Sequence, residues 1–322
     1  MSVTRLLVSS GTADAINTNR RLRQRIHQGF LELGLHSAEA PLEQVAALLE
    51  AQRPELLLIT GSIADPAVDL AWLVQRARAL GCQVAFWLHD DPYEFDLHWP
   101  LAELDCRLFS NEPHCLPYYP PELHARSLAL AASPLDAPIG PGVHDNDAAV
   151  EVDLGFCGAA FPQRVAVLRQ LTAAGLTLAC WGEGWPDDLP GAVNRRLGPA
   201  GLRQLYRRCR WVLNLGRELP IANRRWQIAS STPGPRTFEA ALLGAAQLYV
   251  GQSPRINHYY GPEQGVIAVR QVEEVQELVQ RARREPSWRR RLGRAAASHT
   301  RRHHLYRHRC HDLLAALQET SA

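Results

Sequence analysis

The chain has 322 residues, 35 basic and 33 acidic side chains, 46% hydrophobic residues and a formal net charge of +2. This length favours two domains, and the ordinary apolar fraction with so little net charge excludes an intrinsically disordered chain. No apolar run approaches the roughly 18 residues of a membrane-spanning helix, and the run near the start is too short for a signal-peptide core. We therefore expect a cytoplasmic protein without stable membrane insertion, and the charge balance does not favour nucleic-acid binding.

In the first part of the chain, apolar runs typical of buried strands alternate with segments of helical periodicity. The expected strands cover residues 5–9, 55–60, 83–89, 107–110 and 127–131. The expected helices cover residues 19–33, 41–51 and 66–80, and Asp65 before Pro66 caps the last of them. Residues 133–147 are rich in Pro and Gly and predict a linker.

The alternation resumes after this segment. Strands are expected at residues 152–157, 176–181, 211–215, 247–250 and 266–269, and helices at residues 162–174, 199–208, 236–243 and 272–284. An Arg-rich helical segment follows over residues 286–317. The pattern predicts an α/β protein with two Rossmann-like, doubly wound domains that face each other across a cleft. We place the domains at residues 1–133 and 151–300, the linker at 134–150, and a terminal helix at 301–322 that packs back on the N-terminal domain.

Every basic residue is an arginine, so the chain carries no lysine. This excludes a Walker P-loop, a Schiff-base lysine and a kinase-type ATP lysine. A phosphate group must then be held by arginine, by backbone N–H groups or by helix N-termini. The seven cysteines contain no Cys-x-x-Cys pair, and we expect reduced, buried thiols.

Glycine-rich turns follow two expected strands of the second domain. The first contains Gly158 and leads into a helix with Arg164 in its first turn, an arrangement that favours an anion at the helix N-terminus. The second is Trp-Gly-Glu-Gly-Trp, with Gly182 and Glu183, and suits a shelf for a base or sugar. Purely structural turns are the alternative in both cases.

A third constellation opens the expected helix after residue 235. Arg236 stands at a helix N-terminus, where the helix dipole disfavours a cation, so we expect it to have an anionic partner. Glu239 has apolar neighbours and needs hydrogen-bond donors, which ribose hydroxyls would supply. The alternative is an intramolecular Arg236–Glu239 pair.

The fourth constellation follows an N-terminal strand and contains His89, Asp90 and Asp91. The following Pro favours an extended Asp91, so we expect at least one carboxylate to project into the cleft as a catalytic group, with helix capping as the alternative. Near the C-terminus, His304, His308 and His311 fall on one helical face, but no partner stands at ligand spacing, and we expect no metal site.

Together these motifs resemble the CgeB-type, spore-protein glycosyltransferases. The resemblance covers the chain from about Leu56 to Leu317 and rests on AFWLHDDPYEFD, DCRLFSNEPH, LGFCGAAFPQR, WGEGW, LYRRCRWVLNLG, PRTFEAALLGAAQLY and HHLYRHRCHDLL. It implies a GT-B architecture, with an N-terminal acceptor domain and a C-terminal donor domain. It also implies that a sugar is transferred from a nucleotide-diphosphate donor without a metal.

By similarity to the broader glycosyltransferase family 4, the resemblance also implies residue roles. Glu239 would hold the donor ribose, Arg164 would approach the diphosphate, and His89 would lie near the sugar. Arg236 matches the CgeB-type arginine, and the implied donor site further includes Gly158, Gly182, Glu183 and Asn214. Family 4 usually carries a second Glu seven residues before the ribose Glu, where this chain has Thr232, so donor identity and retaining chemistry stay open.

The expected donor is a UDP-, GDP- or dTDP-linked sugar, with no further cofactor. The acceptor stays open among a glycan, a protein, a small metabolite and a modified nucleic-acid base. A non-catalytic nucleotide- or sugar-binding protein and a nucleotide-sugar epimerase are the alternatives on the same scaffold. The acids that follow His89 favour an enzyme.

Overall fold

The computed structural model describes residues 3–14, 19–64, 66, 68–137, 140–217, 221–251 and 255–319. These residues fall into two compact units. Unit 1 contains the described residues of Met1–Leu130, Pro220–Ser230 and Leu305–Ala322, and unit 2 contains those of Ala131–Leu219 and Ser231–His304. Every helix of the described chain is too short or too polar to span a lipid bilayer.

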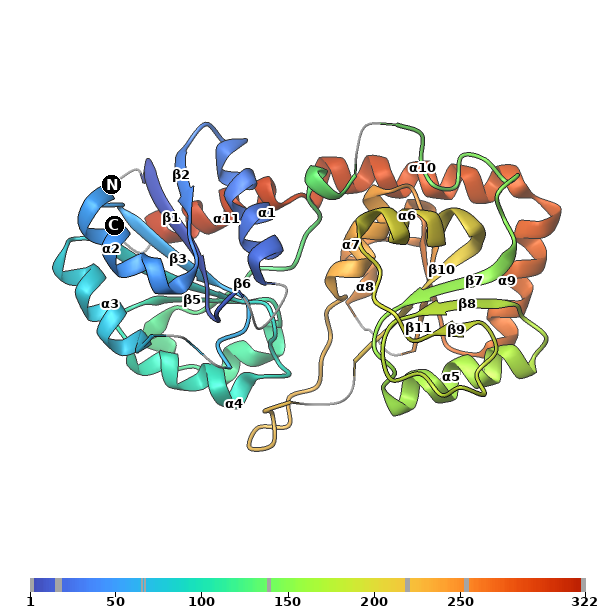
Figure 1. Ribbon diagram of the computed structural model, residues 1–322, viewed down its shortest axis with the longest axis horizontal. Helices are drawn as coiled ribbons and strands as arrows, with labels where there is room; N and C mark the ends of the chain where they lie inside the picture. Colours follow the sequence, from blue (N-terminus) through green and yellow to red (C-terminus); the bar gives the residue numbers. More distant parts are fainter. Residues whose placement is uncertain are drawn as a thin grey trace. The chain divides into compact units, whose positions relative to one another are not determined.

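Unit 1 is built on a six-stranded parallel sheet with the strand order β2-β1-β3-β4-β5-β6 (Figure 1). Its strands are β1 (Arg5–Ser10), β2 (His36–Glu39), β3 (Leu56–Thr60), β4 (Gln83–Leu88), β5 (Arg107–Ser110) and β6 (Arg126–Ser127). Its α-helices are α1 (Asn19–Leu31), α2 (Val45–Gln52), α3 (Leu70–Ala79), α4 (Phe95–His98) and α11 (Tyr306–Glu319). Strands β3 and β4 are continuous apolar runs because helices cover both faces of a parallel sheet.

Unit 2 repeats this architecture with the strand order β12-β11-β10-β7-β8-β9, again all parallel (Figure 1). Its strands are β7 (Val152–Cys157), β8 (Leu178–Trp181), β9 (Ala192–Val193), β10 (Cys209–Leu215), β11 (Gln247–Val250) and β12 (Val266–Val269). Its α-helices are α5 (Pro162–Ala173), α6 (Pro199–Arg208), α7 (Pro235–Leu242), α8 (Ile256–Tyr259), α9 (Val272–Arg284) and α10 (Pro286–His303). The prediction of two doubly wound α/β sheets is confirmed.

The structure differs from the expected elements mainly at sheet edges and helix starts. Strands β2 and β9, which the sequence did not predict, are edge strands, and the strand expected at residues 127–131 is reduced to β6. The helix expected from residue 66 begins at Leu70, where the Asp69 carboxylate caps it by accepting a backbone N–H. The expected cap, Asp65, lies outside the described residues.

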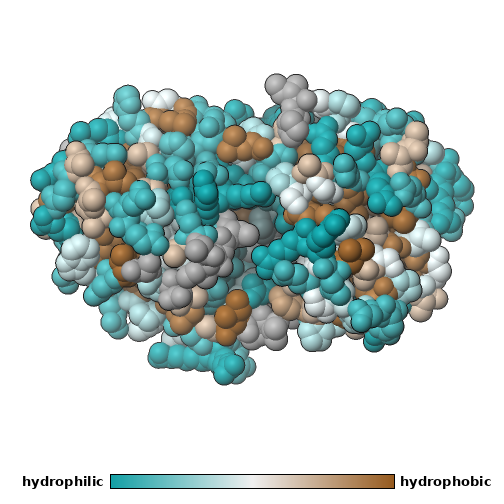
Figure 2. Space-filling model, in the orientation of Figure 1, coloured by the Kyte–Doolittle hydropathy of each residue, from teal (hydrophilic) through white to brown (hydrophobic). Residues whose placement is uncertain are grey.

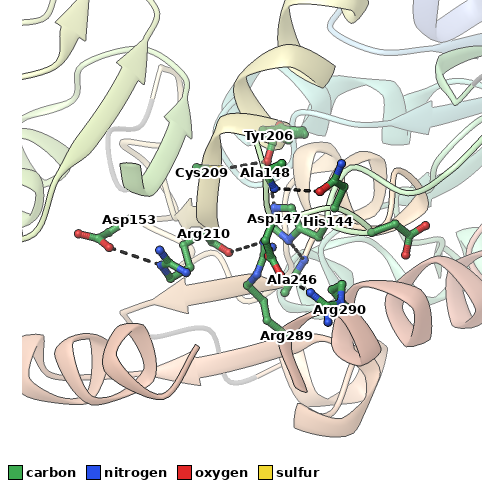
Figure 3. A network of polar contacts seen from close by, with 12 residues as sticks. His144, Asp147, Ala148, Asp153, Tyr206, Cys209, Arg210, Ala246, Arg289 and Arg290 are labelled. Atoms are coloured by element: carbon green, nitrogen blue, oxygen red, sulfur yellow. Dashed lines mark hydrogen bonds and ion pairs between the residues drawn. The ribbon is translucent and has the colours of Figure 1, made fainter. Parts of the chain in front are cut away.

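Residues 140–150, part of the expected linker, pack into unit 2 (Figure 3). His144 is buried, its Nδ1 accepts the Ala246 N–H at 3.0 Å, and its Nε2 donates to the Tyr206 carbonyl at 2.9 Å. Burial and the nearby Arg289 hold the pKa of His144 well below its ordinary value, so the ring is neutral. Asp147 forms ion pairs with two arginines of α10, Arg289 and Arg290. The segment is therefore bonded to unit 2 rather than free.

The expected terminal helical segment is divided between the units. Helix α10 belongs to unit 2 and ends at His303, whereas α11 belongs to unit 1 and packs on α1, with the Cys310 thiol 3.6 Å from the Ile26 carbonyl oxygen. On the face drawn in Figure 2, hydrophobic residues form small groups separated by hydrophilic ones. Scattered apolar residues of this kind are ordinary on a protein surface.

Candidate functional site

The strand order of unit 2 places a switch point between β7 and β10. From β7 the chain proceeds outward to β8 and β9 on one side of the sheet, and then returns to β10, β11 and β12 on the other. The connections after β7 and β10 therefore diverge at the carboxyl edge of the sheet, where ligands bind in open α/β sheets. Helices α5 and α7 begin beside this point, and neither has a side-chain cap on its first N–H groups.

Two of the predicted glycines bring the turns after β7 and β8 into contact. The Gly158 N–H donates to the Trp181 carbonyl at 2.9 Å, and the Trp185 indole N–H donates to the Gly158 carbonyl at 3.1 Å. A Cβ on Gly182 would stand 1.8 Å from the Gly158 oxygen. Gly182 is therefore required for the close approach of the two turns, which fixes the floor of the candidate site.

Arg164 lies at the switch point, but its guanidinium is bonded to the protein itself. It donates to the carbonyls of Gly216 at 2.9 Å, Leu215 at 3.0 Å and Ala159 at 3.1 Å, and it lies over the Phe161 ring at 4.7 Å. These bonds join the turn after β7 to the end of β10. Arg164 therefore holds the two sides of the switch point together, which differs from the phosphate fork that the sequence led us to expect.

The predicted residues of α7 form an ion pair in its first turn. Arg236 donates to Glu239 Oε2 at 2.8 Å, so the intramolecular pair considered for these residues is present. The Arg236 side chain is 45% exposed and the Glu239 side chain only 9%. A buried carboxylate is thus held by a cation that keeps contact with solvent, which leaves the guanidinium accessible to an anionic ligand.

Two further titratable side chains lie near this pair. Tyr206 of α6 and Cys157 at the end of β7 interact electrostatically with Arg236 and Glu239, and burial raises the pKa of both the phenol and the thiol. Both groups are therefore neutral at physiological pH. All seven cysteines are unpaired and all but Cys157 are buried.

Asn214 and Glu183 take positions that the sequence did not predict. Asn214 is buried in β10, where its amide donates to Gln247 of β11 at 2.6 Å and accepts from the Thr237 hydroxyl of α7 at 3.2 Å. It therefore joins the start of α7 to the sheet. Glu183 is exposed and pairs with Arg196 at 2.7 Å.

His89 of unit 1 follows β4 and is half-buried. Its ring stacks on Tyr306 at 6.4 Å and lies 4.5 Å from the Trp87 ring, and its Nε2 is buried without a hydrogen-bond partner among the described residues. Burial and the charge of Arg25 lower the pKa of His89 to about 3. His89 is therefore a neutral imidazole at physiological pH.

Asp91 is a buried carboxylate with hydrogen bonds inside unit 1. It is fully buried, and its two oxygens accept hydrogen bonds from His98 Nδ1 at 2.6 Å and the Ser110 hydroxyl at 2.5 Å. Burial lowers the pKa of His98, but Asp91 and Glu94 outweigh it and raise that pKa to about 9. The Ser62 hydroxyl completes this cluster by donating to Glu94 at 2.6 Å. Asp90 remains half-buried and bonded.

The acidic motif also anchors a segment from the second half of the chain. Residues 221–230, here called the returning loop, belong to unit 1 although they lie in sequence between β10 and α7 of unit 2. The Tyr93 carbonyl and the Asp96 carboxylate accept backbone N–H groups of this loop, and Trp226 packs edge-on against Phe95 at 6.1 Å. This contact was not predicted from the sequence, although a Trp within a polar loop is a signal of burial.

The C-terminal histidines do not form the expected helical face. His304 follows α10 in unit 2, whereas His308 and His311 belong to α11 in unit 1. His304 and His299 each place Nε2 2.9 Å from the Tyr259 carbonyl oxygen. In the described part of the chain, no three His, Cys, Asp or Glu side chains are grouped so that they could hold a metal ion.

The second half of the chain is similar to a family of glycosyl transferase-like proteins. A family model described as glycosyl transferase-like matches residues 164–315, just under half of the chain. No curated protein sequence matches the chain. The matched region contains most of α5, together with β10 and α7, and it includes Arg164, Arg236 and Glu239.

Solved structures match the chain over nearly its whole length. Sucrose-phosphate synthase from Thermosynechococcus elongatus has a TM-score of 0.60 at 12% identity, covering 98% of both chains. HepE of Anabaena, in complex with UDP and glucose, has a TM-score of 0.61 at 10% identity, covering 98% of this chain and 100% of that one. An α-glucosyltransferase in complex with UDP and a 13-mer DNA has a TM-score of 0.61 at 12% identity, covering 91% and 94%. The fold of this chain is the GT-B fold.

Proposed function

We propose that this chain is a glycosyltransferase that moves a sugar from a nucleotide-diphosphate donor to an acceptor. The observation that carries the proposal is the Arg236–Glu239 pair in the first turn of α7, at the switch point of the unit 2 sheet. The glycosyl transferase-like match over residues 164–315 and the UDP bound in two structures of the same fold support it. Within this class, the sequence resemblance favours the CgeB type.

In this proposal Glu239 and Arg236 bind different parts of the donor. The Glu239 carboxylate accepts the ribose hydroxyls, and the half-exposed Arg236 guanidinium stabilises the charge that develops on the diphosphate as it leaves. The N-termini of α5 and α7 have no side-chain cap, and their backbone N–H groups add partial positive charge beside the diphosphate. Arginine and helix N-termini would then supply the positive charge that a metal supplies elsewhere, and we expect turnover to survive excess chelator.

His89 is proposed to hydrogen-bond the transferred sugar rather than to remove a proton. A general base works best with a pKa near the operating pH, and a pKa of about 3 makes His89 a weak base. Its unpartnered Nε2 can still exchange a hydrogen bond with a hydroxyl. This chemistry agrees with retention of configuration, and it assigns no base function to Asp91, whose two oxygens are already bonded.

The nucleotide site is tested by titrating the full chain with UDP, GDP and dTDP in a calorimeter. Glu239→Gln is expected to weaken binding of the preferred nucleotide by about 1–3 kcal/mol, because a charged hydrogen-bond acceptor is lost. The matched control is Glu151→Gln, which removes an exposed unit 2 carboxylate paired with Arg208 at 2.5 Å. Unchanged affinity in Glu239→Gln, or equal loss in both variants, would reject the site.

The reaction is tested with nucleotide sugars and an acceptor library. Transfer predicts release of free nucleoside diphosphate that depends on the acceptor. Isomerisation of the donor without that release would instead identify an epimerase. A structure described as a putative UDP-N-acetylglucosamine 2-epimerase from Listeria monocytogenes matches this chain with a TM-score of 0.52. Nucleotide binding with neither reaction would identify a binding protein.

A further inference from the structure

Unit 2 contains a cavity beside the C-terminal end of α7. It has a volume of about 400 Å³ and lies between α6, residues 140–145, the C-terminal end of α7 and one face of α10. Leu242 at the end of α7 lines it, together with the following Leu243 and Gly244, whereas Arg236 and Glu239 stand in the first turn of the same helix. Since α7 runs between them, this cavity is separate from the proposed donor site.

The wall of the cavity is strongly basic. Its charged residues are four arginines and a single acid, Asp145, in a chain whose basic and acidic side chains number 35 and 33. Arg294, Ser298 and Arg301 follow one another at helical spacing on α10, and they therefore point in one direction. Arg203 of α6 and Arg302 of α10 complete the basic wall.

Asp145 does not neutralise this wall. Its Oδ2 accepts the Gly142 N–H at 2.7 Å, and its Oδ1 lies 3.4 Å from Arg294, whose side chain is 59% exposed. Arg203 donates to the Pro141 carbonyl at 3.1 Å, a bond that positions its guanidinium without cancelling its charge. Four arginines and Asp145 are therefore the charged side chains among the described residues that line a space large enough for an organic anion.

We propose that this cavity binds a small soluble anion that carries two or more phosphate groups. Guanidinium groups present paired N–H donors that match phosphate oxygens, and arginines from two helices can contact phosphates on both sides of one ligand. The Ser298 hydroxyl adds an uncharged donor. A ligand here contacts the last turn of α7, so its effect on the donor would be transmitted through the helix that carries Arg236 and Glu239.

The probe is inorganic pyrophosphate, and the readout is amide hydrogen exchange followed by mass spectrometry on the full chain. Pyrophosphate is expected to slow exchange in peptides that cover residues 140–145 and 294–302. The double variant Arg294→Gln/Arg301→Gln is expected to lose this protection and to weaken binding at least about tenfold. Arg291→Gln is the control, because Arg291 is exposed on α10 but does not line the cavity.

Each outcome supports or overturns the proposal. Protection that is confined to peptides around Arg236 reports the donor site and overturns it, as does equal loss in Arg291→Gln. Vesicles of phosphatidic acid in phosphatidylcholine provide a second arm. One outcome is that the protein floats with these vesicles only when Arg294 and Arg301 are present, while pyrophosphate leaves amide exchange unchanged. That result would assign the cavity to a lipid headgroup and overturn binding of a soluble phosphate. Arg203→Gln, with Arg207→Gln as its control, repeats the test on α6.

Discussion

His98 carries a positive charge inside unit 1, and this makes stability depend on pH. Its pKa is raised to about 9 from an ordinary value near 6.5 by Asp91 and Glu94, against the effect of burial. The stabilisation is therefore complete below pH 6.5 and is lost as the pH rises through 9. The difference in pKa corresponds to about 3 kcal/mol.

We expect the free energy of unfolding of the wild type to fall over this window by up to about 3 kcal/mol. His98→Gln is expected to be less stable at pH 6 and nearly independent of pH between 6.5 and 9, because the titrating group has been removed. Urea denaturation at a series of pH values measures both curves. Parallel curves for the two proteins would contradict a charged His98.

Gly182 and Gly216 allow a matched test of backbone approach at the switch point. A Cβ at Gly182 would collide with the Gly158 oxygen, whereas a Cβ at Gly216 would meet no atom of the described residues within 4 Å. Gly182→Ala is expected to cost at least about 1–3 kcal/mol of stability and to weaken nucleotide binding. Gly216→Ala is expected to stay within about 0.5 kcal/mol of the wild type. Thermal unfolding and nucleotide titration of both variants decide the point, and equal effects would argue against this role of Gly182.

At the scale of elements, residues 140–150 are held to α10 by the ion pair of Asp147 with the fully buried Arg289 (Figure 3). Removing the carboxylate leaves a buried guanidinium uncompensated, so Asp147→Asn is expected to destabilise unit 2 by about 3 kcal/mol. Asp188→Asn breaks an exposed pair with Arg169 and is expected to cost at most about 1 kcal/mol. Chemical denaturation of the two variants gives the comparison, and a similar small cost in both would show that residues 140–150 do not depend on this pair.

Most elements could be predicted because each is encoded locally. A buried parallel strand is a continuous apolar run, as in Leu56–Thr60, and a helix shows its own periodicity. The edge strands β2 and β9 lack that signal, since they are short and at least partly exposed. The expected linker was misread because Pro and Gly mark irregular backbone, and irregular backbone can still be packed, as His144 shows.

The candidate site was predicted where its chemistry lies within one short segment. Arg236 and Glu239 are three residues apart, so their pairing could be considered from the sequence. Arg164 finds its partners about fifty residues away at Leu215 and Gly216, and backbone carbonyls there leave no mark in the sequence. Asp91 was taken for a catalytic acid because the sequence does not reveal that Ser110 and His98 bind both of its oxygens.

At the scale of the whole molecule, unit 1 is assembled from separate parts of the chain. Residues 1–130 supply its sheet, but α11 covers α1 and the returning loop covers Phe95. A fragment of residues 1–130 is expected to expose these apolar faces, bind a hydrophobic dye and unfold without a cooperative transition. The control is the same fragment joined through flexible linkers to residues 221–230 and 305–319, which is expected to recover a cooperative transition. A fragment of residues 1–130 that melts like the reassembled unit would contradict this division.

The returning loop and α11 also reverse the usual order of maturation during translation. A ribosome releases the strands of unit 1 first, yet that unit acquires its last helix only after residue 305 has been made. Unit 2 receives its final residue, His304, before then. Domains generally mature in the order of synthesis, whereas here the amino-terminal sheet must wait for the end of the chain.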